Sequence, residues 1–362
     1  MSPASITLAT RGSALARAQA QLVADALTAR RWDVEIMEVE TRGDRISDEL
    51  IHELGKTGAF VRSLDEKVLE EEADAAVHSL KDIPTDMPGD LIVAAVPERA
   101  SPEDVLVTPS GTTLKELPTE AIVGTASLRR GAQLQAARPD LEIEPIRGNV
   151  DTRLRKLLGP ALRRREAAIA AGVEDEDETE EAVASWRAER SPIEREALDY
   201  EDDEEYDALV LAAAGLERSG FDEQVETVAL PPSSFVPAPG QGAIAVTMRD
   251  TDLADRVNRY LDHPPTRIAV TVERTILERI GGGCIAPIGV FASLQGGVIA
   301  TGVRVLASDG TEEVSANREL PVDGYLDAAL ELADDLAAEG ASELIEAASR
   351  TEPAPEPMRG EE

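Results

Sequence analysis

Short apolar runs alternate with stretches of helical spacing over the first hundred residues. Apolar runs predict strands at residues 6–10, 34–39 and 75–77, and apolar positions near helical spacing predict helices at 14–31 and 60–72. Strands that alternate with helices favour a parallel sheet covered by helices. We therefore expect the chain to begin with an α/β domain.

A second unit repeats this order. Residues 121–124 predict a strand, 125–127 a Ser/Thr turn, and Leu128 begins a predicted helix, just as the turn Arg11–Ser13 separates a strand from a helix in the first unit. Helix N-termini carry unpaired N–H groups that hold anions. We expect two similar α/β domains, each with a helix N-terminus at its sheet edge.

The chain is expected to cross twice between these domains. A strand at 93–97 leads out of the first domain, the proline-rich segment 231–240 leads back, and a strand at 242–248 would rejoin the first sheet, which predicts a hinged cleft. A third unit follows, with helices expected at 268–280 and 326–348. The predicted boundaries are 1–98 with 240–250 for domain 1, 99–239 for domain 2, 251–350 for domain 3 and 351–362 for a disordered tail.

One charged segment breaks the pattern. Residues 158–205 contain the runs Arg163–Arg165, Glu174–Glu178 and Glu201–Glu205, and show no apolar period that could fill a core apart from a short helix at 182–190. We expect an acidic insertion that projects from domain 2 and leaves the cleft intact. A role in partner binding is the less favoured alternative for such a charge run.

The composition is strongly acidic. The formal net charge of −35 disfavours nucleic acid and anionic membranes as partners. Only five of the 36 basic residues are lysines, a bias similar to that of proteins from salt-loving archaea, although a general acidic solubility bias remains open. The chain has neither an 18-residue apolar stretch nor a secretory signal, so we expect a cytoplasmic protein, and the high charge favours a monomer.

Basic residues gather where predicted strands end. Open α/β sheets bind ligands at the carboxyl ends of their strands, and arginine recognises carboxylates with two hydrogen bonds. Taken singly, each arginine is more simply explained as a surface ion pair, but their convergence predicts a cationic cleft for carboxylates or phosphates. The residues are Arg11, Lys81, Arg129, Arg130, Arg147, Arg153 and Arg218.

Two further residues are chemical candidates. Asp82 follows a strand beside Lys81 and would stay ionised in such a cleft, where it could stabilise a cation or move protons; the alternative is an N-cap. Cys284 is the only cysteine and follows three glycines, so it is either a small buried side chain or a covalent attachment point. No histidine pair has metal-ligand spacing, so no metal is expected, and His78 is interpreted as structural.

Seven ordered motifs resemble the porphobilinogen deaminase family, also called hydroxymethylbilane synthases. They span residues 6 to about 350 in family order. The motifs are 8–13, 76–84, 124–130, 146–154, 213–218, 239–243 and 281–289.

The resemblance implies a fold and a reaction. The fold would be two domains like type II periplasmic binding proteins plus a small α+β C-terminal domain. Cys284 would hold a dipyrromethane cofactor through a thioether, and four porphobilinogen molecules would condense head to tail, with loss of ammonia, into hydroxymethylbilane. Asp82 would stabilise the cationic intermediates. By similarity, the residues that bind cofactor or substrate would be the seven basic residues above together with Ser13, Phe60, Thr125 and Ser127.

Two departures from the family pattern stand out. In the loop 53–58 the lysine, Lys56, lies one position earlier than the family usually has it, and the loop is a candidate lid with Gly55 and Gly58 as hinges. The other departure is the acidic segment 158–205. A non-catalytic polycarboxylate-binding protein is the alternative function, since it would need the arginines but neither Asp82 nor Cys284.

Overall fold

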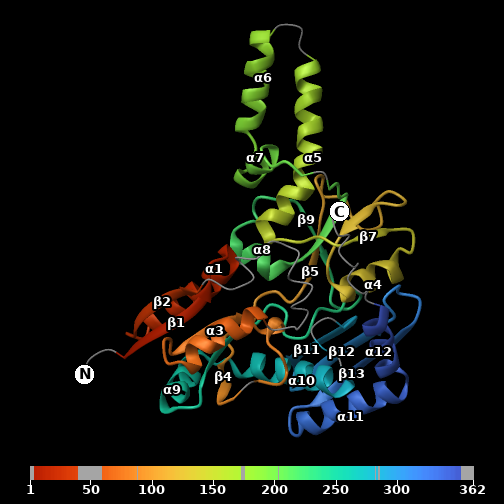
Figure 1. The fold of residues 1–362 in the computed structure, drawn as a ribbon. Helices are drawn as coiled ribbons and strands as arrows, with labels where there is room; N and C mark the ends of the chain where they lie inside the picture. The colour runs from red at the N-terminus through yellow and green to blue at the C-terminus, as the bar shows by residue number, and fades with distance from the viewer. Residues whose placement is uncertain are drawn as a thin grey trace, which may run out of the picture.

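The computed structural model describes residues 4–39, 59–87, 89–172, 176–202, 204–281, 283 and 286–351. Two five-stranded sheets and one three-stranded sheet form the body of the molecule, and a pair of helices projects from it (Figure 1). The tail expected after residue 351 lies outside the described residues. Within the described ranges, no helix combines the length and apolar character needed to cross a bilayer.

The first sheet has the strand order β2-β1-β3-β10-β4. Strands β1, β2 and β3 are parallel, and β10 lies antiparallel between β3 and β4. Successive side chains face opposite sides, so Leu8 packs with α1 and α9 whereas Ala9 packs with α3. The strands are β1 (Ser5–Arg11), β2 (Asp33–Val39), β3 (Ala75–Ser79), β4 (Leu91–Ala95) and β10 (Ile244–Arg249). The helices are α1 (Ala14–Thr28), α3 (Ala59–Leu69) and α9 (Asp252–Leu261).

The second sheet repeats this topology, with the order β7-β6-β8-β5-β9. Again three strands are parallel and the fourth, β5, is antiparallel to both of its neighbours. In each sheet this fourth strand comes from a segment that has crossed from the other domain. The strands are β5 (Asp104–Val107), β6 (Ile122–Gly124), β7 (Glu142–Glu144), β8 (Ala208–Ala212) and β9 (Thr227–Leu230). The prediction of two matching α/β domains is confirmed by this repeated strand order.

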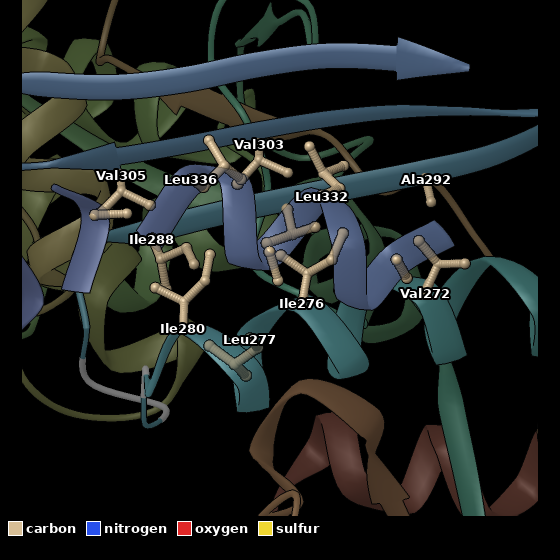
Figure 2. Packing of buried hydrophobic residues seen from close by; sticks show 14 of the residues in the cluster. Val272, Ile276, Leu277, Ile280, Ile288, Ala292, Val303, Val305, Leu332 and Leu336 are labelled. Atoms are coloured by element: carbon tan, nitrogen blue, oxygen red, sulfur yellow. The ribbon is translucent and has the colours of Figure 1, made fainter. Parts of the chain in front are cut away.

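The third part is a small α+β unit. Strands β11 (Ile288–Gln295), β12 (Val298–Leu306) and β13 (Glu313–Pro321) form an antiparallel meander. Helix α10 (Pro264–Ile280) and helix α11 (Tyr325–Ala338) pack their aliphatic side chains against this sheet (Figure 2). The single helix expected over 326–348 is instead two, because the chain turns at Gly340, with φ of +103°, before α12 (Ala341–Thr351).

The charged segment is helical. Helix α5 (Val150–Ala171) and helix α6 (Glu176–Ala188) form the projection in Figure 1, and α7 (Pro192–Leu198) returns the chain to the domain. An ion pair between Glu166 and Arg187 joins the two long helices.

The expectation that residues 158–205 contribute nothing to a core is wrong. Leu158, Ile193 and Ala197 are buried in the core of domain 2 together with Leu154 of α5. Apolar residues at both ends of the segment face the second sheet, and the charge runs between them hide this pattern from a reading by composition. The solvated part is therefore shorter than expected.

Candidate active site

A cavity of about 250 Å³ lies between the two α/β domains. Its walls come from the carboxyl ends of strands in both sheets and from the helices that follow them. It brings together seven residues that the sequence singled out: Arg11, Ser13, Lys81, Asp82, Arg130, Arg153 and Arg218. No described residue between 154 and 210 lines it, so the described part of the helical projection stands clear of its walls.

Two strand ends supply the first-domain wall. Strand β1 ends at Arg11, and the Ser13 side chain caps α1 by accepting a hydrogen bond from the Ala16 N–H at 3.3 Å. The first turn of α1 contains no acidic residue, so its N-terminus can favour an anion.

A short helical turn after β3 presents the catalytic candidate. The turn η1 (Leu80–Asp82) is anchored by Leu80 and Ile83, each about 1% exposed. With these neighbours buried, Lys81 is half-buried and Asp82 is exposed, and both line the cavity.

Helix α4 (Leu128–Ala137) supplies part of the second-domain wall. Ser127 caps it by accepting from the Arg130 N–H, and Thr125 Oγ1 accepts from the Ser127 N–H. Arg130 lines the cavity, and its Nε and Nη2 atoms donate to Asp104 Oδ1 at 2.9 and 2.7 Å. Thr125 and Ser127 themselves do not line the cavity but shape the helix that carries Arg130.

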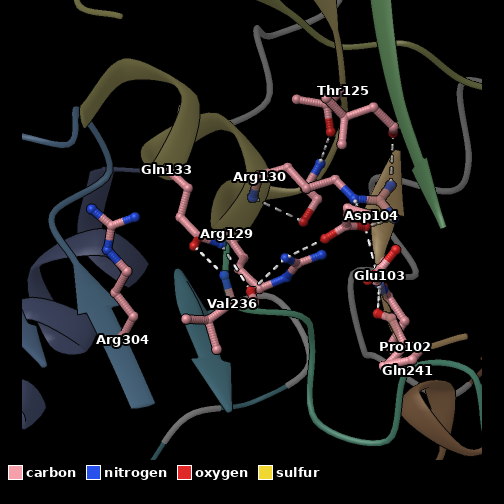
Figure 3. A network of polar contacts seen from close by, with 12 residues as sticks. Pro102, Glu103, Asp104, Thr125, Arg129, Arg130, Gln133, Val236, Gln241 and Arg304 are labelled. Atoms are coloured by element: carbon pink, nitrogen blue, oxygen red, sulfur yellow. Dashed lines mark hydrogen bonds and ion pairs between the residues drawn. The ribbon is translucent and has the colours of Figure 1, made fainter. Parts of the chain in front are cut away.

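Asp104 is the centre of a buried polar network (Figure 3). Arg129 donates to Asp104 Oδ2 at 2.7 Å and to the Val236 carbonyl at 2.8 Å, and Gln241 donates to Asp104 Oδ1 at 3.0 Å. Burial alone would raise the pKa of Asp104, but the guanidiniums of Arg129 and Arg130 outweigh it and hold that pKa well below its usual range. Arg129 therefore faces this network rather than the cavity.

The cavity itself is cationic. Five basic side chains line it against two acidic ones, Asp82 and Asp151, and Asp151 pairs with Arg155 at 2.6 Å. Burial and the nearby Arg130 lower the pKa of Lys81 to about 8, against the opposing pull of Asp82 and Asp104.

Two arginines of the second-domain wall, Arg153 and Arg218, are also partly desolvated. Burial lowers the pKa of Arg153, with a further contribution from Arg130, and burial also lowers that of Arg218. Crowded, partly desolvated cations favour an anionic ligand with several carboxylates.

The remaining predicted site residues lie elsewhere or outside the described part. Arg147 is exposed and is not among the lining residues. Phe60 belongs to α3, but its side chain lies outside the described residues, as do Cys284 and the loop 53–58.

Three polar residues of this region were missed or passed over. His78, interpreted as structural, is buried yet lines the cavity, and its Nε2 lies 3.0 Å from Asp65 Oδ1. Gln19 also lines the cavity and donates to Ser79 Oγ at 2.9 Å. Asp104 carries no local sequence signal that separates it from the many other acidic residues, so only tertiary contacts identify it.

The described residues fit a covalently held polycarboxylate cofactor. The cavity offers guanidinium and ammonium groups to carboxylates, and α10 ends at Ile280, four positions before Cys284 in the sequence. A side chain added at Gly281 or Gly283 would meet no described atom within 4 Å, so the described part of the chain leaves room there for a bulky group.

Two family models match the chain. The model described as porphobilinogen deaminase, dipyromethane cofactor binding domain, matches residues 6–174 and 194–256. The model described as porphobilinogen deaminase, C-terminal domain, matches residues 267–341. The first match is interrupted between residues 174 and 194. Helix α6 lies within this interruption, so it is an addition to the family pattern.

Relatives match over nearly the full length. The probable porphobilinogen deaminase of Halobacterium salinarum is 50% identical over 396 residues, covering 97% of this chain and 100% of the relative. The probable porphobilinogen deaminase of Methanococcoides burtonii is 40% identical, covering 94% and 96%. The porphobilinogen deaminase of Acidothermus cellulolyticus is 39% identical, covering 96% and 92%.

Among solved structures, a nutrient binding protein from Burkholderia cenocepacia bound to methionine superposes with a TM-score of 0.37 at 10% identity, covering 70% of this chain and 89% of that one. This superposition is too loose to add to the strand order described above. The two family models and the near full-length relatives decide the assignment: the chain belongs to the porphobilinogen deaminase family.

Proposed function

We propose that the cavity between the two α/β domains is the active site, with Asp82 as its catalytic carboxylate. The family assignment makes the chain a transferase of tetrapyrrole biosynthesis, a hydroxymethylbilane synthase that uses a dipyrromethane cofactor. It joins four porphobilinogen molecules head to tail into hydroxymethylbilane and releases ammonia.

The cations would hold carboxylates. Each porphobilinogen carries an acetate and a propionate, so a growing chain of pyrroles accumulates negative charge, and bidentate arginine contacts suit it. We assign this role to the lining cations Arg11, Lys81, Arg130, Arg153 and Arg218, with Ser13 and the α1 N-terminus beside them. Arg129, Thr125 and Ser127 would act through α4 by holding Arg130 in place, and a ligand role for Arg147 and Phe60 stays a prediction.

Asp82 would handle charge and protons. The dipyrromethane, attached through Cys284, supplies the primer whose terminal pyrrole carbon is extended. The Asp82 carboxylate would accept a pyrrole N–H, stabilise the positive charge that develops as ammonia leaves, and take up the proton displaced by the new carbon–carbon bond. The position of Asp82 next to Lys81 on the cavity wall, opposite the arginines of domain 2, is the observation that carries this assignment.

Asp82→Asn tests the catalytic role. The amide keeps the size of the side chain but cannot stabilise a cation or accept the proton, so we expect kcat to fall by about 10²- to 10⁴-fold. The matched control is Asp86→Asn, an exposed aspartate in the same segment, which should turn over normally. Intact-protein mass should show the dipyrromethane on both variants and none on Cys284→Ser. An Asp82→Asn variant that carries the cofactor and keeps near-normal kcat would refute the assignment.

The wider properties are also proposals. We propose domain boundaries near residues 98, 240 and 250, supported by the strands each sheet contains. We further propose a cytoplasmic, salt-adapted monomer whose only partner is its small-molecule substrate. The net charge of −35, the scarcity of lysine and the 50% identity to the Halobacterium salinarum relative support the salt adaptation.

A further inference from the structure

Helix α10 contacts the segment around Asp82 directly. We call η1 (Leu80–Asp82), the short turn that carries Asp82, the catalytic turn. Arg274 donates from Nη1 to the Ile83 carbonyl at 2.9 Å and from Nη2 to the Pro84 carbonyl at 2.7 Å. These carbonyls belong to the two residues that follow Asp82. One guanidinium of domain 3 therefore holds two consecutive backbone groups of the domain 1 turn that presents the catalytic carboxylate.

Buried apolar side chains accompany this contact between α10 and the turn. Val270, one helical turn before Arg274, is buried in the same cluster as Leu80 and Ile83, the two anchors of the turn. The Ile83 N–H closes the turn on the Leu80 carbonyl at 3.1 Å. The planar guanidinium of arginine can donate to two carbonyls at once in a fixed geometry, whereas the ammonium of lysine is a compact charge without that geometry.

The packing of this turn is tight around Leu80 and Ile83 but stops at a cavity on the α10 side. A cavity of about 210 Å³ lies beside the contact, between α10 and domain 1, and Leu80, Thr85 and Arg274 are among the residues that line it. Side chains next to a void have fewer neighbours to hold them, so directional hydrogen bonds carry more of the restraint.

The same helix leads to the cofactor. From Arg274, α10 continues for six residues, about 9 Å at 1.5 Å per residue, to Ile280, which precedes Cys284 by four positions in the sequence. Helix α10 thus contacts the chain just after the catalytic turn through Arg274, and Cys284 follows the end of the same helix in the sequence.

We propose that Arg274 is a positioning residue that holds the catalytic turn, and with it Asp82, in place at the cavity wall. It contacts neither substrate nor cofactor; it acts through the carbonyls of Ile83 and Pro84. The proposal rests on the catalytic role assigned to Asp82, and a misplacement of about 1 Å at a reacting group can lower a rate 100-fold.

The same helix offers a matched control. Arg267, seven residues earlier, also donates to two consecutive domain 1 carbonyls, those of Val93 at 3.0 Å and Ala94 at 3.1 Å. These carbonyls belong to β4 rather than to the catalytic turn, although Val93 packs against the same cluster as Leu80 and Ile83. Arg267 and Arg274 therefore both attach α10 to backbone carbonyls of domain 1, and Arg267 is in addition paired with Asp262 at 2.6 Å.

The experiment compares Arg274→Gln with Arg267→Gln in the cofactor-loaded enzyme. Both variants should carry the dipyrromethane by intact mass, and both should unfold at a somewhat lower temperature than the wild type. We expect Arg274→Gln to lower kcat about 10- to 100-fold with little change in KM, and Arg267→Gln to leave kcat within about twofold. Amide hydrogen exchange should accelerate over residues 80–87 in Arg274→Gln and over 91–95 in Arg267→Gln.

Three outcomes would overturn the proposal: equal kcat losses in both variants, normal kcat in Arg274→Gln, or unchanged exchange over residues 80–87. If Arg274→Gln does not fold, Arg274→Lys and Arg267→Lys replace the pair with the same expectations. A normal Arg274→Gln beside an inactive Asp82→Asn would reject the positioning role alone. An active Asp82→Asn would reject the catalytic assignment on which it rests.

Discussion

At the scale of single residues, the cavity changes the chemistry of Lys81 most clearly. Burial and Arg130 lower its pKa from 10.5 to about 8, so it is charged at neutral pH but loses its proton in mildly alkaline solution. Because this folded-state pKa lies below the unfolded value, the burial destabilises the fold below about pH 8, and the penalty fades as the pH rises from about 8 to 10.5.

The Lys81 pKa predicts an alkaline limb in the activity. We expect kcat/KM for porphobilinogen to fall above about pH 8, because Lys81 then loses its charge and no longer attracts the carboxylates of the substrate. The ratio kcat/KM is the one to measure because it reports ionisations of the free enzyme. Lys81→Arg, whose side chain stays charged above pH 12, should move this limb to higher pH. The measurement is kcat/KM against pH for both proteins in the same buffers. An unmoved limb in Lys81→Arg would assign it to the substrate or to another group.

At the scale of elements, the helical projection separates into a core base and a solvated tip. Leu154, Leu158 and Ile193 hold the base in the domain 2 core, and the Glu166–Arg187 ion pair shows that α5 and α6 lie side by side where the tip begins. The tip beyond that pair can be removed without cutting the core.

Two truncations test this division. Replacing residues 167–186 with a short glycine-serine linker should leave the unfolding temperature and kcat close to the wild type, because loops of this kind are tolerated. Removing 160–203 should destabilise the protein severely, at about 2 to 5 kcal/mol for each large buried side chain lost, since Ile193 and Leu198 go with it. Thermal unfolding and kcat of both variants decide; loss of activity in the well-folded short truncation would give the tip a functional role.

At the scale of the whole molecule, one buried carboxylate ties the three domains together. Glu273 of α10 is fully buried and accepts from Arg99 on the first crossover at 2.7 Å, from the Gly240 N–H on the second at 2.6 Å, and from the Ala292 N–H of β11 at 2.8 Å. Both crossover segments between the α/β domains thus bind the same side chain of domain 3.

Neutralising this carboxylate should loosen the whole assembly. Glu273→Gln leaves the largely buried Arg99 without its charge partner, and breaking a buried pair from one side costs about 3 to 5 kcal/mol. Asp334→Asn is the control, because it breaks a solvent-exposed pair with Arg279 in the same domain and should change the free energy of unfolding much less. Urea unfolding of both variants gives the comparison; similar losses would show that the junction tolerates the change.

The sequence by itself determined most of the features that depend on near neighbours in the chain, although it missed the break at Gly340 in the last predicted helix. Strand-turn-helix units, serine caps at Ser13 and Ser127, the two crossovers and the family motifs are patterns of local spacing, and each reflects a backbone preference acting over a few residues. The motifs also indicated the family, and with it the cofactor and the reaction.

Only the tertiary structure decided which charges meet. Arg129 and Arg130 are adjacent in sequence, yet one is held in the Asp104 network and the other also lines the cavity. The Arg274 contact with Pro84 spans 190 residues, and the apolar ends of a charged segment reached the domain 2 core. Such contacts bring together residues far apart in sequence, so their partners follow from how the domains pack and leave no periodic signal along the chain.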